Sequence, residues 1–346
     1  MKDILTYIDK NKDILGIDEY KIDFLQQGEY NINYLITTKD KKFVLRLNSK
    51  SQMNLPNQIR YEYDTLKFLE KSGVTPKVYY VDDSDSKLLN GVILMEYLDG
   101  RSLIYEEDRE KAAYIFSKIH SIDASKANNF IVEKNLFQDR ISEAKFWLKD
   151  VFESSKISKE HKEFFDKFLN YLENNKYKEK YFEDNRIFCL NNTEVNSGNF
   201  IIGEKPYLID WEKAVISDPC QDITHFLVIT TTKWKTDFIA SKEYEDKFFE
   251  DYEKFLNKKI NIKDRVYLYK PYMYSRALSW CMNAYLEYLK EDKLIKNEDT
   301  FKKIKEFTDL NFMKNLIRDY KKITLWQYLK FKFNKFILRQ SCNPMY

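Results

Sequence analysis

The order of two hydrophobic patterns limits the fold of this chain more than any other feature. Three consecutive runs near the N-terminus alternate apolar and polar residues as β-strands do: YKIDFLQQ, NINYLITT and KFVLRLN. From about residue 107 onward, nearly every long segment has the spacing of an amphipathic helix, except a β-like stretch around 186–210. A sheet followed by helices predicts an α+β fold with a small antiparallel sheet and a larger helical part.

Further elements complete the first third of the chain. We predict a helix over about residues 2–15, a helix within 54–73 that stops at Gly73, and two more strands within 77–83 and 87–97. The extended segment from Glu96 to Gly100 is the expected joint. We therefore predict two lobes, a sheet lobe over residues 1–96 and a helical lobe over residues 97–346.

Composition excludes several classes of protein. The 346 residues carry 58 Lys and Arg against 55 Asp and Glu, and a net charge of +3 is too small to indicate a nucleic-acid binder. The four cysteines are scattered without metal-ligand spacing, which favours reduced thiols. Neither a leader peptide nor an apolar stretch of membrane-spanning length is present, so we expect a cytoplasmic protein.

The segment from Cys189 to Leu227 carries most of the chemistry. Glu194 precedes Asn199, the runs FIIG and YLI read as short strands, and Asp210 follows the second of them. If these strands pair as a hairpin, Asn199 and Asp210 lie at the same end and can share a cation. Mg²⁺ prefers such oxygen ligands and completes its shell with water and phosphate. The spacing therefore predicts a metal and nucleotide site.

The same segments resemble the aminoglycoside phosphotransferase/choline kinase family, small-molecule kinases with a two-lobed protein-kinase-like fold. The resemblance rests on NTEVNSGN (192–199), LIDWE (208–212) and DPCQDI (218–223), in this order and at this spacing. It extends through residues 20–230 and implies an ATP-dependent, Mg²⁺-assisted transfer of the γ-phosphate to a hydroxyl of a small polar molecule. Aminoglycoside-like, choline-like and sugar-like acceptors are all compatible with it, as is GTP in place of ATP.

The resemblance implies a nucleotide clamp in the first lobe. Arg46, on the third strand, stands where such kinases carry a phosphate-binding lysine, and Glu62, on the next helix, is its expected partner. A surface arginine on a strand is the alternative. The turn between the first two strands stands where a phosphate-covering loop is expected, although an ordinary hairpin turn has the same pattern; its residues are Gly28, Glu29, Tyr30 and Asn31.

The segment LMEYLDGRSL resembles the hinge that binds the adenine base in these kinases. The resemblance implies that Met95 lines the pocket. It also implies that the carbonyl group of Glu96 and the N–H group of Leu98 bind the edge of the base. An edge strand that runs into a loop is the alternative reading of the same residues.

The catalytic loop departs from the family pattern at two positions. Asn192 replaces a histidine, and Glu194 replaces the catalytic aspartate that orients the acceptor hydroxyl and takes its proton. The resemblance thus implies that Glu194, Asn199 and Asp210 carry the catalysis and that Asn199 and Asp210 hold the metal. The longer carboxylate at position 194 leaves a second function open, a nucleotide-binding pseudokinase or regulator with little turnover.

The last 26 residues are strongly basic. Residues 321–346 contain six Lys or Arg and no acidic residue, with apolar residues gathered on one side of a helical wheel. Two explanations fit this pattern. The segment docks on the helical lobe with its lysines in water, which we favour, or it contacts a membrane surface.

Overall fold

The computed structural model describes residues 2–28, 30–51, 53–84, 88–125, 127, 129–290 and 298–317. The chain forms two compact units. The first comprises the described residues of Met1–Val132, Phe188–Ile216 and Glu250–Asn257, and the second those of Glu133–Ile187, Ser217–Phe249 and Lys258–Tyr346. The predicted lobe division after residue 96 stays a prediction.

A five-stranded antiparallel sheet begins the first unit. Its strands are β1 (Lys21–Gln27), β2 (Asn31–Thr37), β3 (Lys42–Asn48), β4 (Val78–Asp82) and β5 (Val92–Glu96), in the order β1-β2-β3-β5-β4. The first three form the predicted meander, with Arg46 of β3 opposite Asn33 of β2 and Ile93 of β5. This pairing places Arg46 on a strand that has neighbours on both sides.

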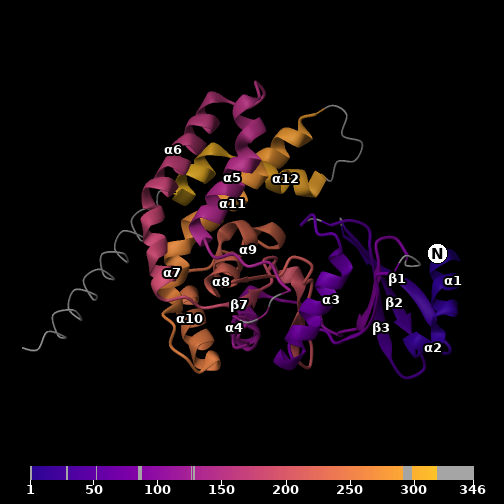
Figure 1. The fold of residues 1–346 in the computed structure, drawn as a ribbon. Coiled ribbons are helices and arrows are strands. Elements are labelled where there is room, and N and C mark those ends of the chain that lie inside the picture. Colours follow the sequence, from indigo (N-terminus) through magenta and orange to yellow (C-terminus); the bar gives the residue numbers. More distant parts are fainter. Residues whose placement is uncertain are drawn as a thin grey trace, which may run out of the picture. The chain divides into compact units, whose positions relative to one another are not determined.

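Two N-terminal helices cover one face of this sheet (Figure 1). Helices α1 (Lys2–Lys10) and α2 (Lys12–Leu15) form a buried core with β2, β3 and β5. Alternate residues of β3, namely Phe43, Leu45 and Leu47, belong to this core. Because successive side chains of a strand point to opposite faces, Val44 and Arg46 point to the other face.

Helix α3 (Gln58–Leu69) packs against β4 and β5. The side chain of Asn57 caps its N-terminus by accepting a hydrogen bond from the N–H group of Arg60, at 3.1 Å. The helix continues as a 3₁₀ turn, η1 (Glu70–Ser72), and stops at Gly73, whose φ of 70° is left-handed. The stop at Gly73 is therefore confirmed.

The rest of the first unit holds short elements around one long helix. The helix is α4 (Tyr105–His120). A small sheet has the order β6-β8-β9, and a second pair joins β7 and β10. Their bounds are β6 (Arg101–Ser102), β7 (Cys189–Asn191), β8 (Phe200–Ile202), β9 (Pro206–Leu208) and β10 (Val215–Ser217), with a 3₁₀ turn η3 (Ser197–Asn199) before β8. The predicted hairpin of β8 and β9 is confirmed.

The second unit is helical, as predicted. It contains α5 (Leu136–Glu153), α6 (Lys159–Asn175), η2 (Lys176–Glu179), α7 (Lys180–Asp184), α8 (Cys220–Leu227), α9 (Ile229–Lys235), α11 (Ile262–Tyr288) and α12 (Glu298–Phe307), while α10 (Lys242–Leu256) is divided between the units. Helix α11 packs along α5, where the rings of Phe137 and Tyr272 stack with centroids 3.8 Å apart. No helix of the described residues is long and apolar enough to cross a membrane. The basic segment 321–346 lies outside the described residues.

We expect Gly203→Ala, in the tight turn between β8 and β9, to destabilise the first unit. A Cβ atom at this position would lie 2.1 Å from the carbonyl oxygen of Asp99, a backbone atom that cannot swing aside. Overpacking of this kind costs about 1–3 kcal/mol. Thermal and denaturant unfolding should show the loss, whereas Lys205→Ala, an exposed change in the same turn, should leave stability nearly unchanged. A Gly203→Ala protein as stable as wild type contradicts the close approach.

Candidate active site

The hairpin of β8 and β9 brings Asn199 and Asp210 together, as the sequence predicted. Phe200 pairs with Leu208, and the N–H group of Ile209 donates to the carbonyl oxygen of Asn199 at 2.9 Å. Asn199 precedes β8 and Asp210 follows β9, so the two residues lie at the same end of the hairpin. The side-chain amide of Asn199 donates to the carbonyl oxygen of Glu194 at 2.6 Å, so the same residue also fixes the preceding loop.

Asp210 has a backbone conformation that is uncommon for a residue with a side chain. Its φ is 65°, in the left-handed region. The side-chain amide of Asn192 holds this bend by donating to the carbonyl oxygens of Ile209, at 3.2 Å, and Asp210, at 2.9 Å. Its oxygen accepts the N–H group of Glu194 at 3.0 Å. Asn192 thus ties the loop that bears Glu194 to the segment that bears Asp210.

Arg46 and Glu62 form a buried ion pair, as the family resemblance implied. Their side chains are 7% and 2% exposed, and one guanidinium nitrogen contacts the Glu62 carboxylate. The same nitrogen lies 3.2 Å from the carboxylate of Asp210, and Nε donates to Asn33 at 3.0 Å. The alternative of a surface arginine is therefore wrong, because Arg46 joins β3, α3 and the segment after β9.

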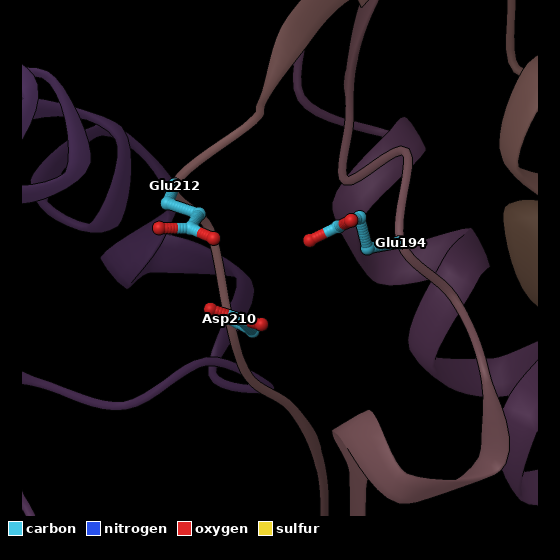
Figure 2. Close-up of side chains that lie close together, drawn as sticks. All are labelled: Glu194, Asp210 and Glu212. Atoms are coloured by element: carbon cyan, nitrogen blue, oxygen red, sulfur yellow. The ribbon is translucent and has the colours of Figure 1, made fainter. Parts of the chain in front are cut away.

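Three carboxyl groups meet beside Arg46. One oxygen from each of Glu194, Asp210 and Glu212 lies within 4.8 Å of the other two. Figure 2 shows Asp210 and Glu212 on one segment of the chain, with the carboxyl group of Glu194 facing them from the opposing loop. Like charges this close repel one another strongly. The arrangement therefore favours a bound cation.

The electrostatics of the site point the same way. Burial and the neighbouring carboxylates of Asp210 and Glu62 raise the pKa of Glu212 to about 7. Burial raises the pKa of Glu62 to about 7 as well, against the attraction of Arg46. Although burial alone lowers the pKa of Arg46, the surrounding carboxylates raise it, so the guanidinium stays charged. Two cations, Arg46 and Lys213, stand beside the four carboxyl groups of Glu62, Glu194, Asp210 and Glu212, so negative charge remains to be balanced.

The donor set fits Mg²⁺. Carboxylate and amide oxygens are the ligands that this cation prefers, and it keeps room for water and phosphate oxygens. Asp210 and Glu212 offer carboxylates, and the oxygen of the Asn199 side chain is outside the hydrogen bond that its amide makes to Glu194. Asp210 and Asn199 were predicted as metal ligands, and that assignment stays a prediction that this donor chemistry supports.

Glu212 is a site residue that our sequence reasoning missed. It is only 7% exposed, and the side-chain amide of Asn31 donates to its carboxylate at 2.6 Å. The amide of Gln58, in α3, donates to its backbone carbonyl oxygen at 2.6 Å. Its place in LIDWE, the motif that also carries Asp210, was a usable signal.

The predicted phosphate loop is only partly described, whereas the predicted hinge segment is described throughout. Gly28 and Tyr30 lie in the turn between β1 and β2, where the N–H group of Gly28 donates to the carbonyl oxygen of Asn31 at 2.9 Å. Glu29 lies outside the described residues. In the hinge segment, Met95 is buried near the end of β5, Glu96 ends that strand, and Leu98 is half-buried beyond it. Their nucleotide contacts stay predictions.

We expect Arg46→Ala to weaken nucleotide binding at least tenfold. It also leaves Glu62 buried without its cation, a change that costs about 3–5 kcal/mol of stability. Arg46→Lys keeps a charge near Glu62 and Asp210 and should retain much of the binding, although it loses the bond from Nε to Asn33. Calorimetric titration with Mg·ATP and thermal unfolding measure the two effects separately. Normal ATP binding by a folded Arg46→Ala protein would remove Arg46 from the nucleotide site.

Comparison with known proteins gives one family and several similar structures. The sequence profile of the phosphotransferase enzyme family matches residues 21–256, about two thirds of the chain. No curated protein sequence matches significantly. The matched region contains Arg46 and Glu62, the predicted hinge segment and all three clustered carboxylates.

Similar solved structures cover almost the whole chain. A putative aminoglycoside phosphotransferase from Ralstonia eutropha JMP134 has a TM-score of 0.67 at 14% identity, covering 93% of this chain and 98% of that one. Spectinomycin phosphotransferase, solved with ADP and spectinomycin, has a TM-score of 0.63 at 15% identity, covering 92% and 98%. Choline kinase LicA from Streptococcus pneumoniae has a TM-score of 0.59 at 18% identity, covering 91% and 100%. The predicted protein-kinase-like fold is therefore confirmed.

Proposed function

The chain belongs to the phosphotransferase enzyme family, and from this premise we propose that it transfers the γ-phosphate of ATP to a hydroxyl group of a small polar molecule. One observation carries the proposal. Arg46, which pairs with Glu62, lies beside a cluster of three carboxylates. A cationic phosphate clamp beside a set of Mg²⁺ ligands is what phosphoryl transfer needs, because its catalysis consists mainly of positioning and electrostatic stabilisation.

Each residue of the site then has a defined task. Arg46 binds phosphate oxygens through its planar guanidinium group, held in place by Glu62. Asp210 and Asn199, with Glu212, would hold Mg²⁺, which when bound neutralises phosphate charge. Gly28 to Asn31 would cover the phosphates, while Met95, Glu96 and Leu98 would bind the base.

Glu194 acts on the acceptor. Its carboxylate orients the hydroxyl group, whose oxygen forms a bond to the γ-phosphorus while the bond from that phosphorus to the β,γ-bridging oxygen breaks. ADP leaves with the electron pair of the broken bond, and the hydroxyl proton passes to Glu194. Glutamate carries the same charge as aspartate and a similar basicity, so the longer side chain does not by itself abolish this role.

The acceptor is proposed by class. The similar structures include aminoglycoside phosphotransferases, a choline kinase and an ethanolamine kinase, so amino sugars and amino alcohols are the first acceptors to test. The experiment is a screen of phosphate transfer from ATP or GTP, with Mg²⁺, to panels of aminoglycosides, amino alcohols, sugars and nucleosides. Transfer to one class supports the proposal. Tight Mg·ATP binding with neither phosphate transfer to any panel nor ATP hydrolysis indicates the nucleotide-binding regulator instead.

We expect Mg·ATP binding near neutral pH to release protons from the protein. A cation at Glu212 favours the ionised carboxylate and lowers a pKa that is about 7 without it. The affinity should therefore be higher at pH 8 than at pH 6. Calorimetric titrations in two buffers of different ionisation enthalpy count the protons, and Glu212→Gln separates those of this residue from those of ATP. Equal proton release by wild type and Glu212→Gln contradicts the prediction.

A further inference from the structure

Lys213, the residue after Glu212, forms an ion pair with Glu194 that the proposed mechanism does not use. Its ammonium nitrogen contacts the Glu194 carboxylate, and the two side chains are 13% and 28% exposed. Thr193 strengthens the connection, because its hydroxyl group donates to the backbone carbonyl oxygen of Lys213 at 3.0 Å. The segment with Lys213 and the loop with Glu194 are thus joined through both backbone and side chains.

This ion pair differs from an ordinary surface pair. Exposed pairs contribute little because water screens them and because two long side chains must be ordered. Here Lys213 is mostly buried and lies beside a cluster of carboxylates that repel one another. Within the part of the chain that the structure describes, the carboxylates have different donors. Arg46 contacts Asp210, Asn31 donates to Glu212, and Lys213 contacts Glu194.

The length of the side chain at position 194 gives the pair a consequence for the reaction. A glutamate has one more rotatable bond than an aspartate, so its carboxylate samples more positions unless a partner restricts it. Efficient transfer requires the accepting oxygen within about 3 Å of the hydroxyl group. Resting on the function proposed above, we propose that Lys213 is a positioning residue that holds the Glu194 carboxylate in the orientation that receives the acceptor hydroxyl group.

The test compares Lys213→Met, which keeps the length but removes the charge, with Lys213→Arg. We expect Lys213→Met to lower kcat about tenfold or more, with little change in the KM for ATP, and Lys213→Arg to restore part of the loss. Lys205→Met, an exposed lysine of the β8–β9 turn, is the matched control and should behave as wild type. An unchanged kcat in Lys213→Met overturns the proposal.

A double-mutant cycle shows whether Lys213 acts through Glu194. In a Glu194→Gln background, Lys213→Met should change kcat less than twofold, because the group that it positions is already lost. The full loss in that background would mean that Lys213 acts on the phosphate or on the fold, and would overturn the proposal.

A crystal structure of Lys213→Met separates this inference from the proposed function. The side chain of Glu194 should turn away from Asp210 and Glu212, and this readout needs no turnover. An unchanged Glu194 would refute the positioning role even in an active enzyme. A displaced Glu194, in a protein that transfers no phosphate, would support the positioning and reject the phosphotransferase function.

Discussion

Asp210→Asn is expected to cause the largest loss in this protein, a fall in kcat on the order of 10³-fold together with the loss of most Mg²⁺-dependent nucleotide binding. The change turns a carboxylate into a neutral amide of nearly the same shape. It removes charge from the proposed metal ligands and from the contact to Arg46, at 3.2 Å, in one step. Binding of ATP measured with and without Mg²⁺ isolates the metal-dependent part.

The fold should survive this substitution. The backbone bend at Asp210 is held through its carbonyl oxygen by Asn192, and a left-handed φ is well tolerated by asparagine. The melting temperature of the variant should therefore remain close to that of wild type. Asp40→Asn, in the exposed turn between β2 and β3, serves as the matched control. Nucleotide binding equal to wild type at every Mg²⁺ concentration would exclude Asp210 from the site.

Glu194→Gln is expected to leave Mg·ATP binding nearly intact and to lower turnover by a factor on the order of 10² or more. Glutamine keeps the length of the side chain and can still contact the acceptor, but it cannot take the hydroxyl proton. It also loses the ionic attraction to Lys213. Steady-state rates with a fixed acceptor and a binding titration give the two quantities, with Glu204→Gln as an exposed control.

Glu194→Asp distinguishes the enzyme from the regulator. In a site built around the longer side chain, the shorter carboxylate no longer reaches both the acceptor and Lys213, so turnover should fall. In a decayed kinase, the same change should create or increase slow ATP hydrolysis. Equal turnover for wild type and Glu194→Gln would instead assign proton transfer to another residue and correct our alignment of the catalytic loop.

The elements of the first unit were predictable from nearby residues. The alternation in KFVLRLN determines which residues of β3 pack on α1 and α2, and the same alternation sends Arg46 to the opposite face, toward α3. Asn57 and Gly73 mark the two ends of the α3 segment through capping and a left-handed stop. These signals act within a few residues, which is why periodicity and turn chemistry reveal them.

The composition of the site was only partly predictable. The resemblance placed Glu194, Asn199 and Asp210 in order along the chain, and the hairpin of β8 and β9 explains why two of them meet. It did not reveal Glu212, because an acid after a strand is common. Nor did it reveal Lys213, because no local pattern distinguishes this lysine from the many others in the chain. Asn192 departs from the family pattern, but its side-chain amide still has a structural role, because it donates hydrogen bonds to the backbone at Ile209 and Asp210.

The sequence by itself determined the local elements and the identity of the charged groups, since strand alternation, helix caps and the β8–β9 hairpin depend on neighbours in the chain. Only the tertiary structure decided which charges meet. Arg46 contacts Asp210 across 164 positions, and Asn31 contacts Glu212 across 181. Such contacts form only when strands, helix and loop pack together, and their burial then sets the charge balance. The raised pKa values of Glu62 and Glu212, and the demand for a cation at this site, follow from that packing and from no local pattern.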